Sequence, residues 1–190
     1  MLSANGIPLL GFGTFPLNND EVERCLAMAL EVGFRHIDTA QMYGNEKAVG
    51  HALKASGVAR QELYIVTKVD PGNVSAKAFR PSVEASIEAL NGPVDLLLIH
   101  WPPPEADLDA IIDRLVAAQA AGLTRHIGVS NFPSALMRRA AARSALPLIN
   151  NQVEFHPLID QSKVLAEARA LGMTLSAYCS SLCDNSRGLF

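Results

Sequence analysis

Four polar side chains that could share one reaction lie in the first half of the sequence, namely Asp38, Tyr43, Lys68 and His100. Taken singly, each has an ordinary explanation as a capping, solvated or hydrogen-bonded residue. Together they predict general-acid catalysis by a phenol. A tyrosine has an ordinary pKa of about 10, which is too high for rapid proton exchange at neutral pH, so a neighbouring ammonium is expected to lower that pKa.

The other three residues supply what the phenol of Tyr43 lacks. We expect Lys68 to stabilise the phenolate, Asp38 to pair with Lys68, and His100 to hydrogen-bond the carbonyl oxygen of a substrate or to assist a proton relay. None of these side chains can donate hydride, so the set implies a nicotinamide cofactor. No metal is implied, because Cys179 and Cys183 have no third cysteine or histidine nearby.

The elements that must position these residues alternate between short apolar runs and longer segments with helical spacing, a pattern typical of βαβ units. Successive strands begin about 25–30 residues apart from the second strand onward. A helix is predicted over 107–123, with an apolar stripe of Leu108, Ile111, Ile112, Leu115 and Ala118. The predicted strands are 7–14, 36–40, 63–69, 94–101, 125–131, 148–155 and 173–180.

Two α/β architectures fit this pattern, an open doubly wound sheet and a (β/α)₈ barrel. The run from Gly11 to Thr14 lacks the third glycine of a dinucleotide-binding fingerprint, which weakens the first architecture. Polar residues follow nearly every predicted strand, as they do where a barrel assembles its active site at one end. The (β/α)₈ barrel is therefore the predicted fold.

Composition limits the class of protein. With 190 residues and 49% hydrophobic content, a single domain over 1–190 is expected. The net charge of -3 offers no basic surface for nucleic acid. The N-terminus does not resemble a secretory signal, and the longest strongly apolar run, Val94–Ile99, is far too short to cross a membrane. A cytoplasmic location is expected.

Five motifs carry a resemblance that spans essentially the whole chain. They are GFRHIDTAQMYGNE (33–46), TK (67–68), DLLLIHWP (95–102), GVSNF (128–132) and NQVEFHP (151–157). In this order they resemble the aldo-keto reductase family, and most of all its bacterial branch of 2,5-diketo-gluconate reductase-like enzymes. The resemblance implies a (β/α)₈ barrel that reduces a small-molecule aldehyde or ketone with NADPH, which the family resemblance favours over NADH.

The same resemblance implies roles for individual residues. Asp38, Tyr43, Lys68 and His100 match the catalytic tetrad, with Tyr43 as the proton donor. The residues implied to contact the nicotinamide part of the cofactor are Thr14, Asp38, Ser130, Asn131, Gln152 and Tyr178, the last by stacking under the ring. Phe15 and Trp101 are implied to line the substrate pocket. Ordinary hydrogen bonding is the alternative for Thr14 and Gln152, and core packing is the alternative for Trp101.

The sequence departs from the family pattern towards its end. Cys179-Ser180-Ser181-Leu182 stands where the family usually has Ser-Pro-Leu after the tyrosine, so a differently shaped turn is expected. A seventh helix, an eighth strand and a basic adenosine-binding segment have no counterpart before Phe190. We therefore expect an incomplete barrel whose open edges favour association and whose 190 residues do not sustain turnover. A truncated, inactive reductase-like protein and a non-catalytic cofactor-binding module are the alternatives to an active enzyme.

Overall fold

The computed structural model describes residue 3 and residues 5–180, and its strands form one parallel sheet. The strands pair in the order in which they occur along the chain. They are β1 (Gly11–Gly13), β2 (His36–Asp38), β3 (Tyr64–Val69), β4 (Val94–Ile99), β5 (Thr124–Ser130), β6 (Leu148–Glu154) and β7 (Thr174–Tyr178). All seven predicted strands are confirmed. The first is much shorter than predicted, because the chain bends at Leu9 and Leu10 and continuous pairing begins only at Gly11.

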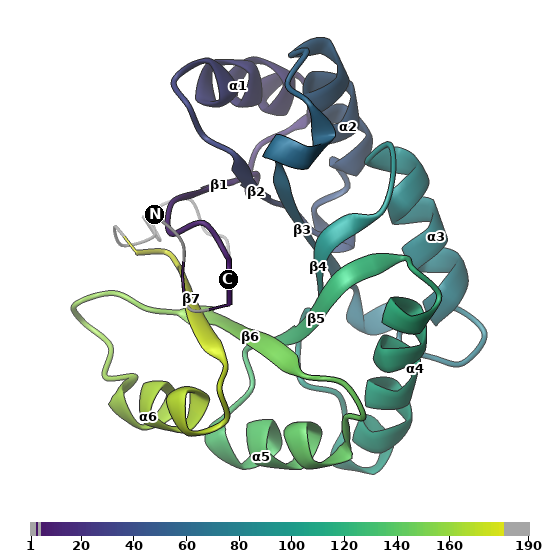
Figure 1. The fold of residues 1–190 in the computed structure, drawn as a ribbon, viewed down its shortest axis with the longest axis vertical. Coiled ribbons are helices and arrows are strands. Elements are labelled where there is room, and N and C mark those ends of the chain that lie inside the picture. Colours follow the sequence, from purple (N-terminus) through teal and green to yellow (C-terminus); the bar gives the residue numbers. More distant parts are fainter. Residues whose placement is uncertain (1–2, 4, 181–190) are drawn as a thin grey trace.

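Helices connect successive strands and lie on the outer side of the curled sheet (Figure 1). They are α1 (Asn19–Glu31), α2 (Glu46–Ala55), α3 (Phe79–Ala89), α4 (Leu108–Ala120), α5 (Ser134–Arg143) and α6 (Ser162–Ala170). The short 3-10 turns are η1 (Gln41–Tyr43), η2 (Arg60–Glu62), η3 (Pro71–Asn73) and η4 (Glu105–Asp107). The apolar stripe predicted for 107–123 is buried along α4, which confirms the expected amphipathic helix.

Alternation along the strands separates two apolar regions. In β4, Leu96 and Leu98 belong to an inner cluster with Tyr64 and Val66, whereas Leu97 and Ile99 pack outward against the helices. A parallel strand that is buried on both faces explains the nearly continuous hydrophobicity of Val94–Ile99. The same alternation brings Lys68 and His100 to the inner side, two residues beyond the inner residues Val66 and Leu98.

The strands curve into most of a barrel, with β1 and β7 as the two edges of the sheet within the described residues (Figure 1). The segment before β1 links these edges at the end where the strands begin. The side-chain amide of Asn5 donates hydrogen bonds to the carbonyl oxygens of Ile149 and Gly172, at 2.9 and 3.0 Å, and to Oγ1 of Thr174 at 3.1 Å.

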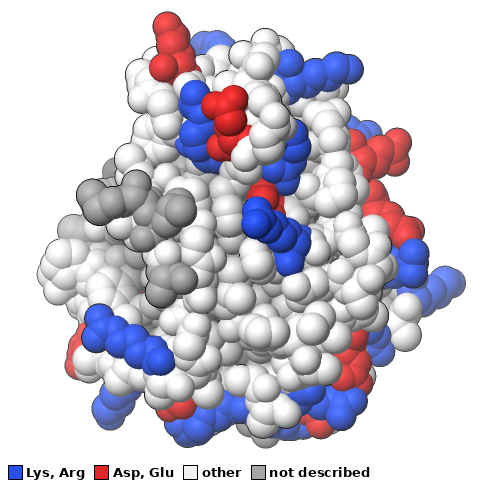
Figure 2. Space-filling model, viewed as in Figure 1, with Lys and Arg blue, Asp and Glu red and all other residues white. Residues whose placement is uncertain are grey.

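The surface carries charges of both signs, interspersed over the face in Figure 2. Ion pairs join neighbouring outer helices: Arg139 with Asp109 and Arg143 with Asp113 between α4 and α5, and Arg138 with Glu167 between α5 and α6. Within the described ranges, no helix combines the length and the apolar character needed to span a bilayer.

Candidate active site

The four candidate catalytic residues meet at the carboxyl ends of neighbouring strands. Asp38 is the last residue of β2, Lys68 the last but one of β3, and His100 directly follows β4. Tyr43 ends η1, the turn that follows β2. Parallel strands place their carboxyl ends at the same mouth of a barrel, so residues far apart in sequence become neighbours there.

Lys68 is the centre of this group. It is only 1% exposed, and its Nζ donates to Asp38 Oδ1 at 2.5 Å, to the Thr39 carbonyl oxygen at 2.9 Å and to the Tyr43 hydroxyl at 3.2 Å. Burial lowers the pKa of Lys68, but the Asp38 carboxylate and the Tyr43 hydroxyl outweigh burial and leave that pKa raised. The side chain is therefore a buried ammonium with three acceptors, which uses all its donors.

The phenol of Tyr43 lies between this ammonium and two rings. Its ring centroid is 5.1 Å from that of Phe15 and 5.6 Å from that of His100. Burial raises the pKa of Tyr43, and Lys68 acts in the lowering direction, as predicted, without reversing the effect of burial. The pKa of Tyr43 is raised overall because desolvation of the phenolate, together with the Asp38 carboxylate, exceeds the attraction of the ammonium.

His100 is neutral at physiological pH. It is 7% exposed, and burial together with the charge of Lys68 lowers its pKa to about 4. Nδ1 is buried without a hydrogen-bond partner among the described residues. The ring lies against Trp101 at a centroid distance of 6.2 Å and an interplanar angle of 21°. A neutral imidazole offers one N–H donor, which suits hydrogen bonding to a carbonyl oxygen.

Gln152 closes the group from the opposite side of the barrel. Its Nε2 donates to Asp38 Oδ2 at 2.7 Å, so both carboxylate oxygens of Asp38 have partners. The resemblance implied a cofactor contact for Gln152, and the bond to Asp38 was not predicted. The Oε1 atom of Gln152 has no hydrogen-bond partner among the described residues.

Three further cofactor candidates contact one another beside His100. The Tyr178 hydroxyl donates to Asn131 Oδ1 at 2.9 Å, and Asn131 Nδ2 donates to the His100 carbonyl oxygen at 3.1 Å and to Ser130 Oγ at 3.2 Å. Ser130 Oγ donates in turn to the Gln152 carbonyl oxygen at 2.8 Å. Asn131 has a φ of 63°, a left-handed conformation that asparagine tolerates better than most residues.

Thr14 is separate from this cluster. It is fully buried, and its hydroxyl donates to Oγ1 of Thr39 at 3.0 Å, next to the side chain of Asn45. This placement agrees with ordinary hydrogen bonding, and a cofactor contact remains a prediction. The two candidate substrate residues are accessible: Phe15 is 57% exposed and Trp101 is 45% exposed. Their rings flank Tyr43 and His100, as the prediction of a substrate pocket requires.

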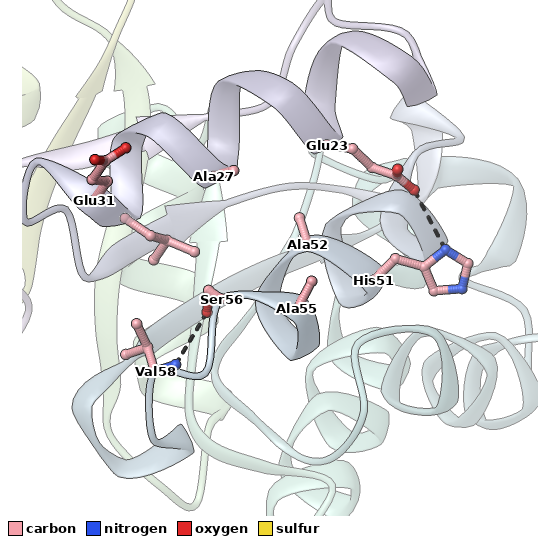
Figure 3. A pocket seen from close by; sticks show the side chains of 9 residues that line it. Glu23, Ala27, Glu31, His51, Ala52, Ala55, Ser56 and Val58 are labelled. Carbon is pink, nitrogen blue, oxygen red and sulfur yellow. Dashed lines mark hydrogen bonds and ion pairs between the residues drawn. The ribbon is translucent and has the colours of Figure 1, made fainter.

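A separate groove lies away from these residues. A groove of about 530 Å³ between α1 and α2 is lined by alanines and by Glu23, Glu31 and His51, as Figure 3 shows. His51 Nδ1 lies 3.4 Å from Glu23 Oε1, and both side chains are well exposed. None of the candidate catalytic, cofactor or substrate residues lines this groove, so it contributes nothing to the site at the barrel mouth.

A curled parallel sheet with outer helices and a polar cluster at the carboxyl ends of its strands is the arrangement of the α/β-barrel class. A family model described as the aldo/keto reductase family matches residues 9–181, and the chain belongs to that family. This finding and the structure confirm the predicted family and fold class.

Similar proteins agree with this assignment. Over 176 residues the chain is 45% identical to a methylglyoxal reductase DkgB from Escherichia coli O157:H7, covering 90% of this chain and 66% of the relative. A crystal structure described as that of a 2,5-diketo-D-gluconic acid reductase B matches with 46% identity and a TM-score of 0.91, over 97% of this chain and 64% of the other.

A third similar protein was solved with a nucleotide. The structure of a Bombyx mori aldo-keto reductase in complex with NADP has 31% identity and a TM-score of 0.86, over 94% of this chain and 65% of the other. The chain thus spans about two thirds of the length of these three proteins.

Proposed function

We propose that this chain carries the catalytic centre of an NADPH-dependent oxidoreductase that reduces aldehydes and ketones to alcohols, with Tyr43 as the proton donor. The observation that carries the proposal is the buried ammonium of Lys68, held between Asp38 at 2.5 Å and the Tyr43 hydroxyl at 3.2 Å. Such a group stabilises a phenolate at the moment when the phenol gives up its proton.

The residues beside this centre fit a nicotinamide. Its carboxamide needs both donors and acceptors, and Ser130, Asn131 and Gln152 supply amide and hydroxyl groups at one place. The Gln152 Oε1 atom is an acceptor without a partner among the described residues. The half-buried ring of Tyr178 lies against the same group through its bond to Asn131. When bound there, the cofactor would supply the hydride that no side chain can provide.

The protein's own residues then complete the reaction. Because the pKa of Tyr43 is raised, its phenol is protonated at neutral pH and is ready to donate. The carbonyl oxygen accepts the phenolic proton, the carbonyl carbon accepts hydride, and an alcohol forms. The phenolate that remains lies beside the Lys68 ammonium and recovers a proton from solvent. His100, which is neutral, orients the carbonyl oxygen by a hydrogen bond from its ring N–H.

The chemical class of substrate follows from the rings around the centre. Phe15 and Trp101 present exposed aromatic faces on either side of Tyr43 and His100. Aromatic walls with a few convergent polar groups are typical of sites for small organic molecules. We therefore propose small aldehydes and ketones, and the relatives named methylglyoxal reductase make methylglyoxal the first substrate to assay.

The test uses the protein restored to the full length of its relatives, and compares Tyr43→Phe with Tyr64→Phe in a reductase assay with NADPH and methylglyoxal. Tyr43→Phe removes only the proton donor, so kcat should fall by about 10²-fold or more while the Kd for NADPH stays nearly constant. Tyr64 is a matched control, because its hydroxyl is buried without a partner among the described residues, within the inner apolar cluster. A wild-type protein that binds no NADPH, or a Tyr43→Phe variant with nearly normal kcat, would contradict the proposal.

A further inference from the structure

The turn that carries Tyr43 is short, and little of its own structure fixes it. It consists of the three residues of η1, without a side-chain cap, and is followed by Gly44 at a φ of 67°. The Tyr43 hydroxyl has one hydrogen-bond partner among the described residues, Lys68. Something beyond the turn itself must hold the phenol in position.

Gln41, two residues before Tyr43, anchors the turn on one side. Its Nε2 donates to the hydroxyls of Ser82 and Ser86 on α3, both at 3.2 Å. Its Oε1 accepts from the backbone N–H of Asp70 and from Asn73 Nδ2, both at 2.9 Å, in the connection after β3. One amide therefore makes four hydrogen bonds and uses its full capacity for donors and acceptors.

Asn45, two residues after Tyr43, anchors the turn on the other side. It is 1% exposed, and its Nδ2 donates to the carbonyl oxygens of Thr14 and Leu17, at 3.1 and 3.0 Å, in the connection after β1. Its Oδ1 accepts from the Thr39 hydroxyl at 3.1 Å, and that hydroxyl in turn accepts from the Thr14 hydroxyl at 3.0 Å. This network also accounts for the burial of Thr14.

We propose that Gln41 and Asn45 are paired positioning residues that clamp the Tyr43 turn between the connection after β1 and the connection after β3. The inference rests on the proposed role of Tyr43 as proton donor. The two amides stand symmetrically about Tyr43 in the sequence. Asn45 is bonded to the connection after β1, and Gln41 is bonded to the connection after β3 and to α3. Loss of either amide releases one side of the turn and lets the phenol drift from Lys68 and from the substrate carbonyl.

The replacements follow from the partners of each amide. Gln41→Met keeps the length of the side chain and removes all four hydrogen bonds. Asn45→Asp keeps the shape but turns a carboxylate oxygen towards the carbonyl oxygens of Thr14 and Leu17, which offer it no proton. Asn73→Ala is a milder change that removes a single bond to Gln41, and it serves if Gln41→Met does not fold.

Asn5→Ala is the matched control. Asn5 is also an amide with several hydrogen bonds to distant parts of the chain, but it lies at the opposite end of the strands. Its loss should lower the thermal stability of the protein without changing the position of Tyr43. A stability effect alone is thereby separated from a positioning effect.

The experiment measures three quantities in each variant of the protein restored to the full length of its relatives: kcat with methylglyoxal, the Kd for NADPH, and the pKa of Tyr43 from its tyrosinate absorbance. The Tyr43 signal is isolated by subtracting the titration of Tyr43→Phe. We expect Gln41→Met and Asn45→Asp to lower kcat by about 10–10²-fold, the scale of a misplacement near 1 Å, with little change in Kd. Since burial raises the pKa of Tyr43, a released turn should bring that pKa down towards about 10.

The outcomes distinguish the proposed positioning role of Gln41 and Asn45 from the proposed function. If Tyr43→Phe keeps its activity, the proposed function fails, whatever the amide variants do. If Tyr43→Phe is inactive while folded Gln41→Met and Asn45→Asp keep the wild-type kcat and the wild-type pKa of Tyr43, the positioning role of Gln41 and Asn45 is overturned and the proposed function stands. An Asn5→Ala variant that loses kcat as strongly as they do would also overturn that positioning role, because the effect would then follow from stability.

Discussion

His100 should make the stability of the protein depend on pH over a defined range. In the folded protein, burial and the neighbouring Lys68 ammonium lower the pKa of His100 to about 4, from an ordinary value of 6.5. Between these two pH values the unfolded chain binds a proton at this position and the folded protein does not. The contribution of His100 to the free energy of unfolding is therefore complete above about pH 6.5 and is lost as the pH falls towards 4.

The size of this effect follows from the separation of the two pKa values. At 1.36 kcal/mol for each pKa unit, the interval from 6.5 to about 4 corresponds to at most about 3 kcal/mol. Solvent screening at the open mouth of the site reduces this figure, so we expect about 1–3 kcal/mol. A loss of this size is a substantial part of the stability of a typical domain, which is about 5–15 kcal/mol.

The assay is urea unfolding of the wild type and of His100→Gln at pH 7, 5.5 and 4.5. Glutamine is polar but does not titrate, and the contributions of all other groups largely cancel between the two proteins. The wild type should lose about 1–3 kcal/mol more than the variant as the pH falls. In parallel, the His100 ring signal in NMR spectra should not titrate between pH 5 and 8. Equal losses in the two proteins, together with a His100 titration near pH 6.5, would refute the reasoning.

Three further changes test other parts of the structure. Lys68→Met removes the ammonium that counteracts the effect of burial on the pKa of Tyr43, so that pKa should rise. The alkaline limb of the pH–rate profile for alcohol oxidation should then move to higher pH, and an unchanged profile would contradict the role of Lys68 in setting the pKa of Tyr43. Asp38→Asn should lower kcat by misplacing Lys68, and a normal kcat would argue against that positioning. Gly50→Ala would place a Cβ 1.9 Å from the Ala89 carbonyl oxygen, so thermal denaturation should show a free energy of unfolding that is lower by about 1–3 kcal/mol. An unaltered Tm would show that α2 and α3 move apart at little cost.

The strands and helices could be predicted because residues on buried faces are apolar and recur at the spacing of a strand or a helix. The run Val94–Ile99 is apolar on both faces since inner and outer clusters enclose β4, and the stripe from Leu108 to Ala118 follows the buried side of α4. The convergence of Asp38, Lys68 and His100 could also be predicted, because each lies at or near the carboxyl end of a strand of a parallel sheet.

The details of the site depended on features that have no local signal. The bond from Gln152 to Asp38 spans 114 positions and depends on the curvature of the sheet. The direction of the Tyr43 pKa depends on a balance between burial and charge, and composition says nothing about that balance. Gln41 and Asn45 both lay within the motif 33–46 that matched the family, but their hydrogen-bond partners lie in other parts of the chain and could not be read from that motif.

The Asn5 amide imposes an order on how the chain assembles. Every strand pairs with its predecessor in the sequence, so the sheet can grow by successive additions with modest loop-closure entropy. The Asn5 bonds differ from this pattern, because their acceptors lie 144 to 169 residues further along the chain. During synthesis Asn5 leaves the ribosome first, yet its acceptors form only after β6 and β7 have been made. The Asn5 bonds can therefore form only when β6 and the start of β7 are in place, whereas Ile7 in the same segment packs with residues of β3 and β4.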